Sequence, residues 1–337
     1  MEKKPQAPLP PRQHQFSHTG RLKRALLTII TVLLVVGGAG GAYAWHMYRT
    51  AQSSFSQTYR ALPSKPSDTA LTDGKPFAIL LLGTDTGALG RHDVGRTDTM
   101  IVATINPKKQ TAKLTSIPRD TLVNIWGSQQ DDEKINAAFP LYGPATTIKT
   151  VEHLVNIPIH YYVLLNMGGL EKMIDAVGGV TVTPPLTFHY EQANVVKGHK
   201  IHLNGAAALA YSRMRDDDPL GDYGRQARQR QIIKQLVLKE ASFQSLPRYQ
   251  SVLSSLQTNM QTNLTFQDMV WLRTKYGHTS RHIESQTLQG KPAIINGIDY
   301  QIAPMTTIAQ ISNDLRKELN LPNDTHFQTD ALEPSGF

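Results

Sequence analysis

Cysteine is absent from the 337 residues of this chain. Its absence excludes disulfide bonds, thiol nucleophiles, cysteine-ligated zinc and iron–sulfur clusters, and it leaves the redox compartment open. The chain is 40% hydrophobic and 18% charged, which is ordinary for a globular protein. Its length allows one large domain or two small ones with a substantial core.

An evenly spread positive charge is also lacking, although the net charge is +8. Residues 1–24 carry a net +5, so the rest of the chain carries only +3. The basic footprint of a nucleic-acid-binding protein is therefore weak, and we expect no nucleic-acid partner.

Several motifs of known chemistry are missing. There is no GxxxxGK[ST] loop, no HExxH pair and no GxSxG elbow, and the glycines between 83 and 90 are too loosely spaced for a dinucleotide fingerprint. His199 and His202 are three residues apart but lack a third zinc ligand. Covalent catalysis and P-loop ATP hydrolysis are therefore not indicated.

A charge-free apolar run does occur, at residues 25–45. At ~1.5 Å per residue it is long enough to cross a bilayer core of roughly 30 Å, so a transmembrane helix is predicted at residues 25–46. The basic tail before it places the N-terminus in the cytoplasm and the rest outside. A cleaved signal peptide is the alternative, since Ala42-Tyr43-Ala44 resembles a cleavage site.

Strand-like and helix-like segments alternate after this run. The predicted organisation is a cytoplasmic basic tail (1–24), a transmembrane helix (25–46), an extracellular stalk (47–75), an extracellular domain (76–325) and a C-terminal tail (326–337). For the extracellular domain we predict an α/β fold, in which a central mixed sheet has helices on both faces.

The chain is organised around a glycine-rich loop between two predicted strands, Phe77–Leu82 and Met100–Ile105. Asp85 and Asp98 stand at the ends of these strands with arginines between them. Two carboxylates beside arginines suit a divalent cation together with a phosphate. The alternative is a solvated Gly/Asp turn.

A second group of charged residues lies further along the chain. Arg213 and Arg215 are two residues apart, and in an extended segment, Tyr211–Arg215, both would point to the same face. Asp222 is predicted as the N-cap of a long helix to Ser242, whose N-terminal turns would present on one face Arg225, Arg228 and Gln229. Such a face favours an anion, and a solvated basic surface is the alternative.

Seven short motifs occur in an order that resembles the LytR–CpsA–Psr family of cell-wall glycopolymer ligases. They are LLLGTD at 80–85, GRTDTM at 95–100, TSIPRD at 115–120, KINAAF at 134–139, IDAVGGV at 174–180, LNGAAALAYSRMR at 203–215 and DYGRQARQRQ at 222–231. Together they cover most of residues 77–240, and the resemblance beyond about residue 245 is weaker.

This resemblance implies a membrane-anchored phosphotransferase with an extracellular catalytic domain. Such enzymes transfer a glycopolymer from an undecaprenyl-pyrophosphate carrier to the muramic acid C6 hydroxyl of peptidoglycan, which gives a phosphodiester. The family fold is an α/β sandwich with a hydrophobic pocket for the polyprenyl chain. Teichoic acid, capsule and other anionic glycans all stay open as the polymer.

The resemblance also implies roles for individual residues. Asp85 and Asp98 would hold Mg²⁺, with Mn²⁺ as an alternative. Our own hypothesis is that Asp98 or Asp85, if not fully occupied by metal, accepts the proton of the attacking hydroxyl. The catalytic residues would be Asp85, Asp98, Arg119, Arg213 and Arg215. The pyrophosphate would be bound by Arg96, Arg119, Lys134, Arg213, Arg215, Asp222, Arg225, Arg228 and Gln229.

The lipid pocket is the least visible feature of the sequence. Candidate lining residues, which plain core packing would explain equally, are Val151, Leu154, Val155, Leu164, Leu170, Ile232, Ile233, Leu236 and Val237. Two other functions stay open: a regulator that binds polyprenyl phosphates without catalysis, and a pyrophosphatase that uses water as the acceptor.

Overall fold

A computed structural model describes residues 41–43, 45–62, 70–85, 95–129, 132–240 and 257–324. The chain divides into two units, residues 1–50 and 51–337, and the second holds the sheet. No helix within the described residues has the length and apolarity needed to cross a membrane. The predicted transmembrane segment and both predicted tails lie almost wholly outside these residues, so the structure leaves those predictions untested.

The second unit alternates strands with helices, as the sequence predicts. Its strands are β1 (Phe77–Thr84), β2 (Thr97–Asn106), β3 (Thr111–Ser116), β4 (Leu122–Val123), β5 (Glu133–Lys134), β6 (Tyr161–Asn166), β7 (Val180–Val182), β8 (Phe188–Tyr190), β9 (Ala193–Val195), β10 (Ile201–Leu203), β11 (Met260–Thr262), β12 (His282–Thr287), β13 (Lys291–Ile295) and β14 (Ile298–Ile302). Its helices are α2 (Ala70–Asp73), η1 (Ile135–Ala137), α3 (Ala138–Val155), α4 (Met167–Ala176), α5 (Gly205–Arg213), α6 (Asp222–Glu240), α8 (Phe266–Tyr276), η3 (Gly277–Arg281) and α9 (Met305–Glu318).

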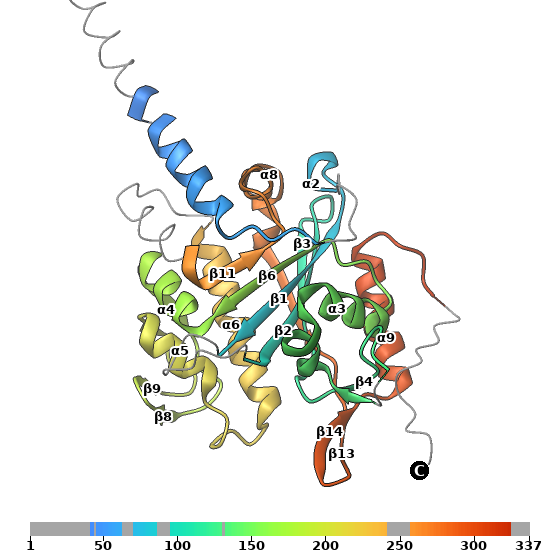
Figure 1. Ribbon diagram of the computed structural model, residues 1–337. Helices are drawn as coiled ribbons and strands as arrows, with labels where there is room; N and C mark the ends of the chain where they lie inside the picture. The colour runs from blue at the N-terminus through green and yellow to red at the C-terminus, as the bar shows by residue number, and fades with distance from the viewer. Residues whose placement is uncertain are drawn as a thin grey trace, which may run out of the picture. The chain divides into compact units, whose positions relative to one another are not determined.

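The central sheet has the strand order β11-β6-β1-β2-β3-β12. β1 pairs antiparallel with β2 and parallel with β6, and β3 pairs parallel with β12. The predicted α/β fold with a mixed central sheet is thereby confirmed. Helices flank this sheet (Figure 1).

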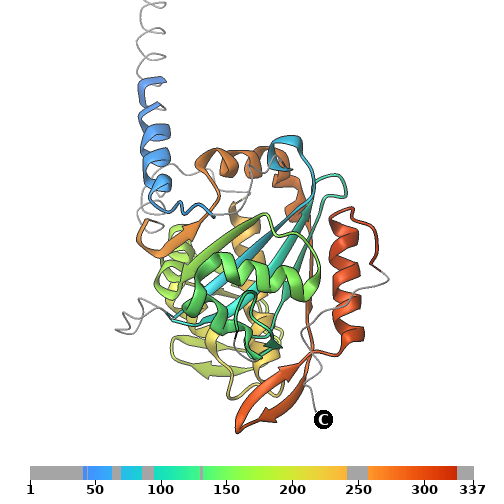
Figure 2. The same cartoon turned by 45° about the vertical axis from the view of Figure 1, so that its right-hand side comes forward.

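One face of the sheet is closed by helices α3 and α9. Ala78, Leu80 and Leu82 alternate along β1 and join one buried cluster with Val151 of α3 and Ile311 of α9. Figures 1 and 2 show α3 lying across the sheet and α9 beside it. Because side chains of a strand point to alternate faces of the sheet, every second residue of β1 joins the buried hydrophobic core on this side.

The opposite face of the sheet carries the intervening residues of the same strands. Ile79 and Leu81 of β1 point to this side, where they line a cavity together with Ala103 and Leu114. Helices α6 and α8 supply lining residues across from them. The two faces of one sheet thus serve different purposes, core packing and cavity formation.

Two helix ends follow from local sequence signals. The Asn204 side chain caps α5 by accepting a hydrogen bond from the amide of Ala207 at 2.9 Å. After α4, Gly178 and Gly179 have φ angles of 77° and 79°, the left-handed conformation that glycine adopts without strain.

Two local predictions around the second charged group are wrong. The segment Tyr211–Arg215 is not extended throughout, because α5 continues to Arg213 and Met214 caps it. Asp222 is the first residue of α6 rather than its cap. Its carboxylate accepts a hydrogen bond from Gln226 Nε2 at 2.6 Å, so it still serves the first turn of the helix.

Candidate active site

A β-bulge places Asp98 at the edge of the cavity. Gly83 pairs with Thr99 and Thr84 pairs with Thr97, so Asp98 is the extra residue of β2 between them. A bulge bends its strand and redirects the side chain of the extra residue. Asp85 directly follows β1, and both carboxylates line the cavity.

The bulge depends on glycine at position 83. A Cβ added to Gly83 would lie 2.9 Å from the Cβ of Thr99 on the neighbouring strand, closer than real side chains approach. The absence of a side chain at position 83 therefore permits the strand pairing that presents Asp98.

Arg119, just after β3, holds the Asp98 carboxylate. Its Nη1 donates to Asp98 Oδ1 at 2.8 Å. Burial alone would lower the pKa of Arg119, but the carboxylates of Asp98, Asp120 and Asp222 raise it above its ordinary value. Arg119 is therefore a permanent cation beside the bulge.

Arg225, on the first turn of α6, also contacts the bulge. Its Nη2 lies 3.3 Å from the carbonyl oxygen of Asp98 and 2.5 Å from Asp222 Oδ1. Burial lowers its pKa, and the positive charges of Arg119 and Arg215 add to that, while Asp222 opposes it. An added anion would relieve this repulsion among cations.

Arg213 and Arg215 bring a third source of positive charge, from the end of α5. Arg213 Nη1 lies 3.1 Å from both carboxylate oxygens of Glu191, at the turn between β8 and β9. Arg215 is about half exposed and bonds only weakly to Asp216, at 3.3 Å from Nε to Oδ1. Arg213, Arg215 and Asp216 line the cavity, whereas Glu191 does not.

Lys134 belongs to a neighbouring string of charges rather than to the cavity lining. Asp120 lies 3.5 Å from Arg119 Nε and 2.9 Å from Lys134 Nζ, so it bridges the two cations. The Lys134 ammonium also stands 5.7 Å from the centre of the Tyr300 ring. Lys134 is therefore linked to the cavity through Asp120 and Arg119.

Three other predicted pyrophosphate ligands lie outside the cavity lining. Arg228 is completely buried, with its guanidinium against Asp218 and backbone carbonyl groups, so it does not share one open face with Arg225 and Gln229. Arg96 is exposed at the start of β2 and is not part of the lining. Asp222 is also outside it and acts through Arg225.

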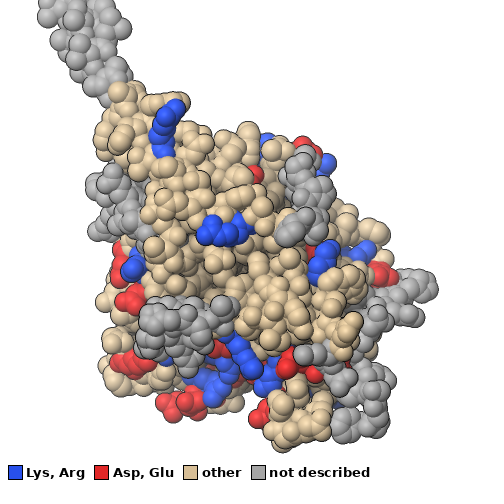
Figure 3. Space-filling view, viewed as in Figure 1, with Lys and Arg blue, Asp and Glu red and all other residues tan. Residues whose placement is uncertain are grey.

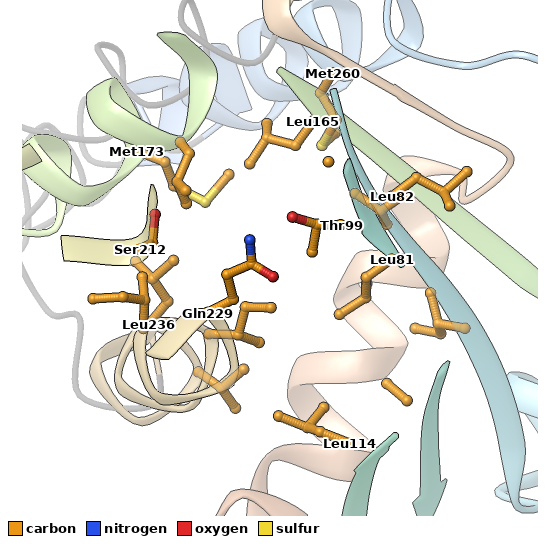
Figure 4. A pocket seen from close by; sticks show the side chains of 18 of the residues that line it. Leu81, Leu82, Thr99, Leu114, Leu165, Met173, Ser212, Gln229, Leu236 and Met260 are labelled. Carbon is orange, nitrogen blue, oxygen red and sulfur yellow. The ribbon is translucent and has the colours of Figure 1, made fainter. Parts of the chain in front are cut away.

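The cavity itself has a volume of about 960 Å³. It is mostly apolar, with side chains from β1, β2, β3, β6, α4, α6 and α8. Figure 4 shows Thr99, Ser212 and Gln229 directed into the same space as Leu81, Leu165 and Leu236. The cavity therefore changes from apolar to polar and charged, the profile of a site for an amphipathic ligand.

The predicted lipid-pocket residues separate into two sets. The residues of α4 and α6 line the cavity, namely Leu170, Ile232, Ile233, Leu236 and Val237. The others, Val151, Leu154, Val155 and Leu164, lie in the closed core beneath α3 and α9. Core packing explains this second set.

Sequence reasoning missed several polar residues at the cavity. Ser212 and Asp216 flank the arginines of the 213–215 segment, and Thr99 follows the bulge. Position beside a predicted site residue was the available signal for these three. Glu191 had no such signal, because the β8–β9 turn brings it to Arg213 from 22 residues away.

The charge at this end of the molecule is mixed rather than uniformly basic. Figure 3 shows lysine and arginine side chains gathered with acidic ones where β1 ends in Figure 1. Within the described ranges, no group of three or more His, Asp or Glu side chains could hold a metal ion. Asp85 and Asp98 both line the cavity, and carboxylate oxygens are the kind of ligand that Mg²⁺ takes when substrate phosphates complete its shell.

Comparisons with known proteins converge on one family. The model of the LytR_cpsA_psr family matches residues 43–317. The chain is 39% identical over 292 residues to the polyisoprenyl-teichoic acid–peptidoglycan teichoic acid transferase TagU of Enterococcus faecalis, covering 87% of this chain and 95% of that protein. It is 37% identical over 320 residues to Biofilm regulatory protein A of Streptococcus mutans, covering 90% and 78% respectively. A solved structure titled "TagT bound to LIIa-WTA" superposes with a TM-score of 0.62 at 27% identity, covering 76% of this chain and 94% of that one.

Proposed function

The chain belongs to the LytR_cpsA_psr family, and we propose that it is a Mg²⁺-dependent phosphotransferase that attaches an anionic glycopolymer to peptidoglycan. The donor is an undecaprenyl-pyrophosphate-linked polymer of teichoic acid or capsular type, and the acceptor is the muramic acid C6 hydroxyl. The transferase name of the Enterococcus faecalis relative supports this reaction class. The observation that carries the proposal is an apolar cavity that ends at two carboxylates and four arginines.

The two ends of the cavity match the two parts of such a donor. The apolar stretch along Leu81, Leu165 and Leu236 suits a polyprenyl chain, because burial of each CH₂ group contributes about 0.8 kcal/mol. The charged end suits a diphosphate. A donor bound this way places its diphosphate between β1, β2 and α6.

The arginines supply the counter-charge for the diphosphate. Arg119, Arg213, Arg215 and Arg225 line the charged end from three separate segments. A guanidinium can donate two parallel hydrogen bonds to phosphate oxygens, which fixes orientation as well as charge. Phosphoryl transfer depends mainly on such positioning and neutralisation.

Asp85 and Asp98 are the proposed Mg²⁺ ligands. Bound Mg²⁺ would neutralise charge on the phosphate oxygens. Arg119 orients the Asp98 carboxylate, and whichever of Asp85 and Asp98 keeps a free oxygen accepts the proton of the acceptor hydroxyl.

The proposed reaction is a single displacement at phosphorus. The acceptor oxygen bonds to the phosphorus that carries the polymer, and the bond from this phosphorus to the bridging oxygen of the diphosphate breaks. Undecaprenyl phosphate leaves, and the polymer stays on peptidoglycan through a phosphodiester. Removal of the acceptor proton balances the charge.

The proposed location follows from the sequence. Residues 25–46 would anchor the protein in the cell membrane with the N-terminus in the cytoplasm, so the catalytic domain meets its lipid donor and the wall outside. Membrane fractionation with a size measurement tests the anchor, and a soluble, shortened product would contradict it.

Two other functions use the same site. A regulator that only binds polyprenyl phosphates is favoured by the name of the Streptococcus mutans relative, and it would tolerate loss of Asp85 and Asp98. A pyrophosphatase would use water in place of the acceptor hydroxyl.

A reconstituted transfer assay separates these functions. The purified chain is mixed with lipid-linked polymer, peptidoglycan fragments and Mg²⁺, and wall-bound and free polymer are quantified. The proposal requires wall-bound polymer that disappears in the double variant Asp85→Asn, Asp98→Asn. Free polymer would indicate the pyrophosphatase, and binding without turnover would indicate the regulator.

A further inference from the structure

Arg228 stands out among the charged residues because it is completely buried. It lies on α6 between Arg225 and Gln229, which both line the cavity, yet its own side chain is outside the lining. A buried charge is costly unless its partners satisfy it, so its surroundings indicate what it does.

Every side of the Arg228 guanidinium is occupied by the protein. Nε donates to the carbonyl oxygen of Tyr211 at 3.0 Å, and Nη2 donates to the carbonyl oxygen of Met214. Nη1 forms an ion pair with Asp218 Oδ2. The guanidinium also lies 5.4 Å from the centre of the Phe188 ring and 5.9 Å from that of Tyr211, and these two rings stack on each other.

Asp218 is built into the same place. Its side chain is almost fully buried, and Oδ1 accepts a hydrogen bond from the amide of Leu220 at 2.8 Å. A Cβ at Gly224 would overlap its carboxylate, so α6 can approach Asp218 only with glycine at that position. Asp218 thus ties the connection between α5 and α6 to Arg228.

These contacts join the two chain segments that hold the arginines of the cavity, namely the end of α5 with its following loop and the start of α6. Tyr211 and Met214 flank Arg213 in the chain, and the segment from Met214 to Asp218 contains Arg215. Arg225 is fixed to α6, one turn before Arg228. The position of one arginine group relative to the other therefore depends on Arg228 and Asp218.

We infer that Arg228 and Asp218 are positioning residues, which set the spacing of Arg213 and Arg215 against Arg225 and thereby the affinity for a diphosphate headgroup. This inference rests on the proposed function, because it assigns the diphosphate to these arginines. A lysine at position 228 could not replace the arginine, since one ammonium on a flexible stem lacks the planar fork that serves two carbonyl groups and a carboxylate at once.

The test compares a ligand that has a diphosphate with one that has only the tail. Geranylgeranyl diphosphate with Mg²⁺ and uncharged geranylgeraniol are titrated against the full chain in detergent, and binding is followed by calorimetry. The variants are Arg228→Lys and Asp218→Asn, and the latter keeps the size of the side chain and an oxygen for the Leu220 amide.

Arg230→Lys is the matched control. Arg230 is a second buried arginine on α6, but its Nη1 donates to Ser116 Oγ at 2.5 Å and it does not line the cavity. Unfolding midpoints of all variants are measured first, so that binding is compared only among folded proteins.

We expect Arg228→Lys and Asp218→Asn to weaken diphosphate binding at least fivefold and to leave geranylgeraniol binding unchanged. Arg230→Lys should change neither. Equal loss for both ligands would overturn the inference, as a general structural role would produce it, and so would unchanged diphosphate binding in Asp218→Asn. If the wild-type chain does not prefer the diphosphate over the alcohol, the proposed function fails as well.

Discussion

Arg119 and Asp98 form a direct ion pair at the edge of the cavity, with Arg119 Nη1 2.8 Å from Asp98 Oδ1. The pair joins the end of β3 to the bulge of β2. Both partners are partly exposed, so the pair itself adds little stability. Its effect is on geometry, since a carboxylate held by a guanidinium keeps one orientation.

Arg119→Ala should lower the rate of glycopolymer transfer by about a thousandfold. This is the size of effect seen when an arginine that stabilises charge in the transition state of phosphoryl transfer is lost. The assay is the initial rate of transfer with lipid-linked donor. The control is Lys113→Ala, a cation of β3 that pairs with Glu284 at 3.3 Å and does not line the cavity. Near-normal transfer by Arg119→Ala would remove Arg119 from the site.

Removal of Mg²⁺ with a chelator should abolish transfer, and added Mg²⁺ should restore it. Asp85→Asn and Asp98→Asn should each raise the Mg²⁺ concentration for half-maximal rate at least tenfold, because each removes a proposed ligand charge. Asp299→Asn, an exposed position on β14, serves as the control. Equal Mg²⁺ dependence in all variants would contradict the ligand assignment.

Gly83→Ala should destabilise the fold by roughly 1–3 kcal/mol, since the new methyl group meets Thr99 and must push the strands apart. Transfer should fall further than stability explains, because the bulge at Asp98 shifts with the strands. Denaturant unfolding and transfer rates are compared with Gly168→Ala, which does not line the cavity and where an added Cβ would meet no atom closer than 3.8 Å. An active and fully stable Gly83→Ala variant would rule out a tight contact there.

Glu191→Gln should strengthen the binding of a diphosphate ligand by a modest factor, about two- to fivefold. Glu191 holds the Arg213 fork from both oxygens and must release it when a phosphate binds. The factor is small because Glu191 is 40% exposed, and such ion pairs contribute about 0.2–1 kcal/mol. Calorimetry with geranylgeranyl diphosphate measures it. Weaker binding by this variant would show that Glu191 helps to orient Arg213.

Arg230→Met should raise the unfolding midpoint by about 2–4 °C at pH 7. Burial lowers the pKa of Arg230 to about 10, and within the described residues no carboxylate forms an ion pair with it. Because this folded-state pKa lies below the ordinary value of arginine, charged Arg230 opposes folding below pH 10, and stability should increase as the pH rises above about 10.

Arg228→Met is the contrasting variant for that experiment. It leaves the Asp218 carboxylate buried without its partner, so it should cost about 3–5 kcal/mol. Calorimetric scans of both variants at pH 7 provide the comparison. A lower midpoint for Arg230→Met would mean that the hydrogen bond to Ser116 outweighs the cost of burial.

The strands and the helix ends were predictable because their signals are local. The short apolar run Phe77–Leu82 indicates β1, and Asn204 is a favourable residue for the start of α5. The bulge at Asp98 was not predictable, since strand register depends on which residues face each other across two strands.

The sequence indicated that arginines gather at the site, but it did not indicate which of them line the cavity. At 100° per residue, Arg228 lies only about 60° from Arg225 around α6, so helical spacing alone does not separate them. The position of α5 decides that Arg228 is buried and Arg225 lines the cavity. In the same way, helical periodicity could not show that Val151 packs in the core while Leu236 lines the cavity.

The second face of the sheet has a consequence for the life of the protein in the cell. Leu81, Ala103 and Leu114 line a cavity that lies between the sheet and α6, with Ile233 of α6 packed against them, so a bound polyprenyl tail would complete the interior on that side. A ligand that binds only the folded chain stabilises it in proportion to its supply. The resistance of the protein to proteolysis would then increase with the concentration of the lipid carrier. The amount of the protein in the cell would therefore depend on how much lipid carrier is present for wall synthesis.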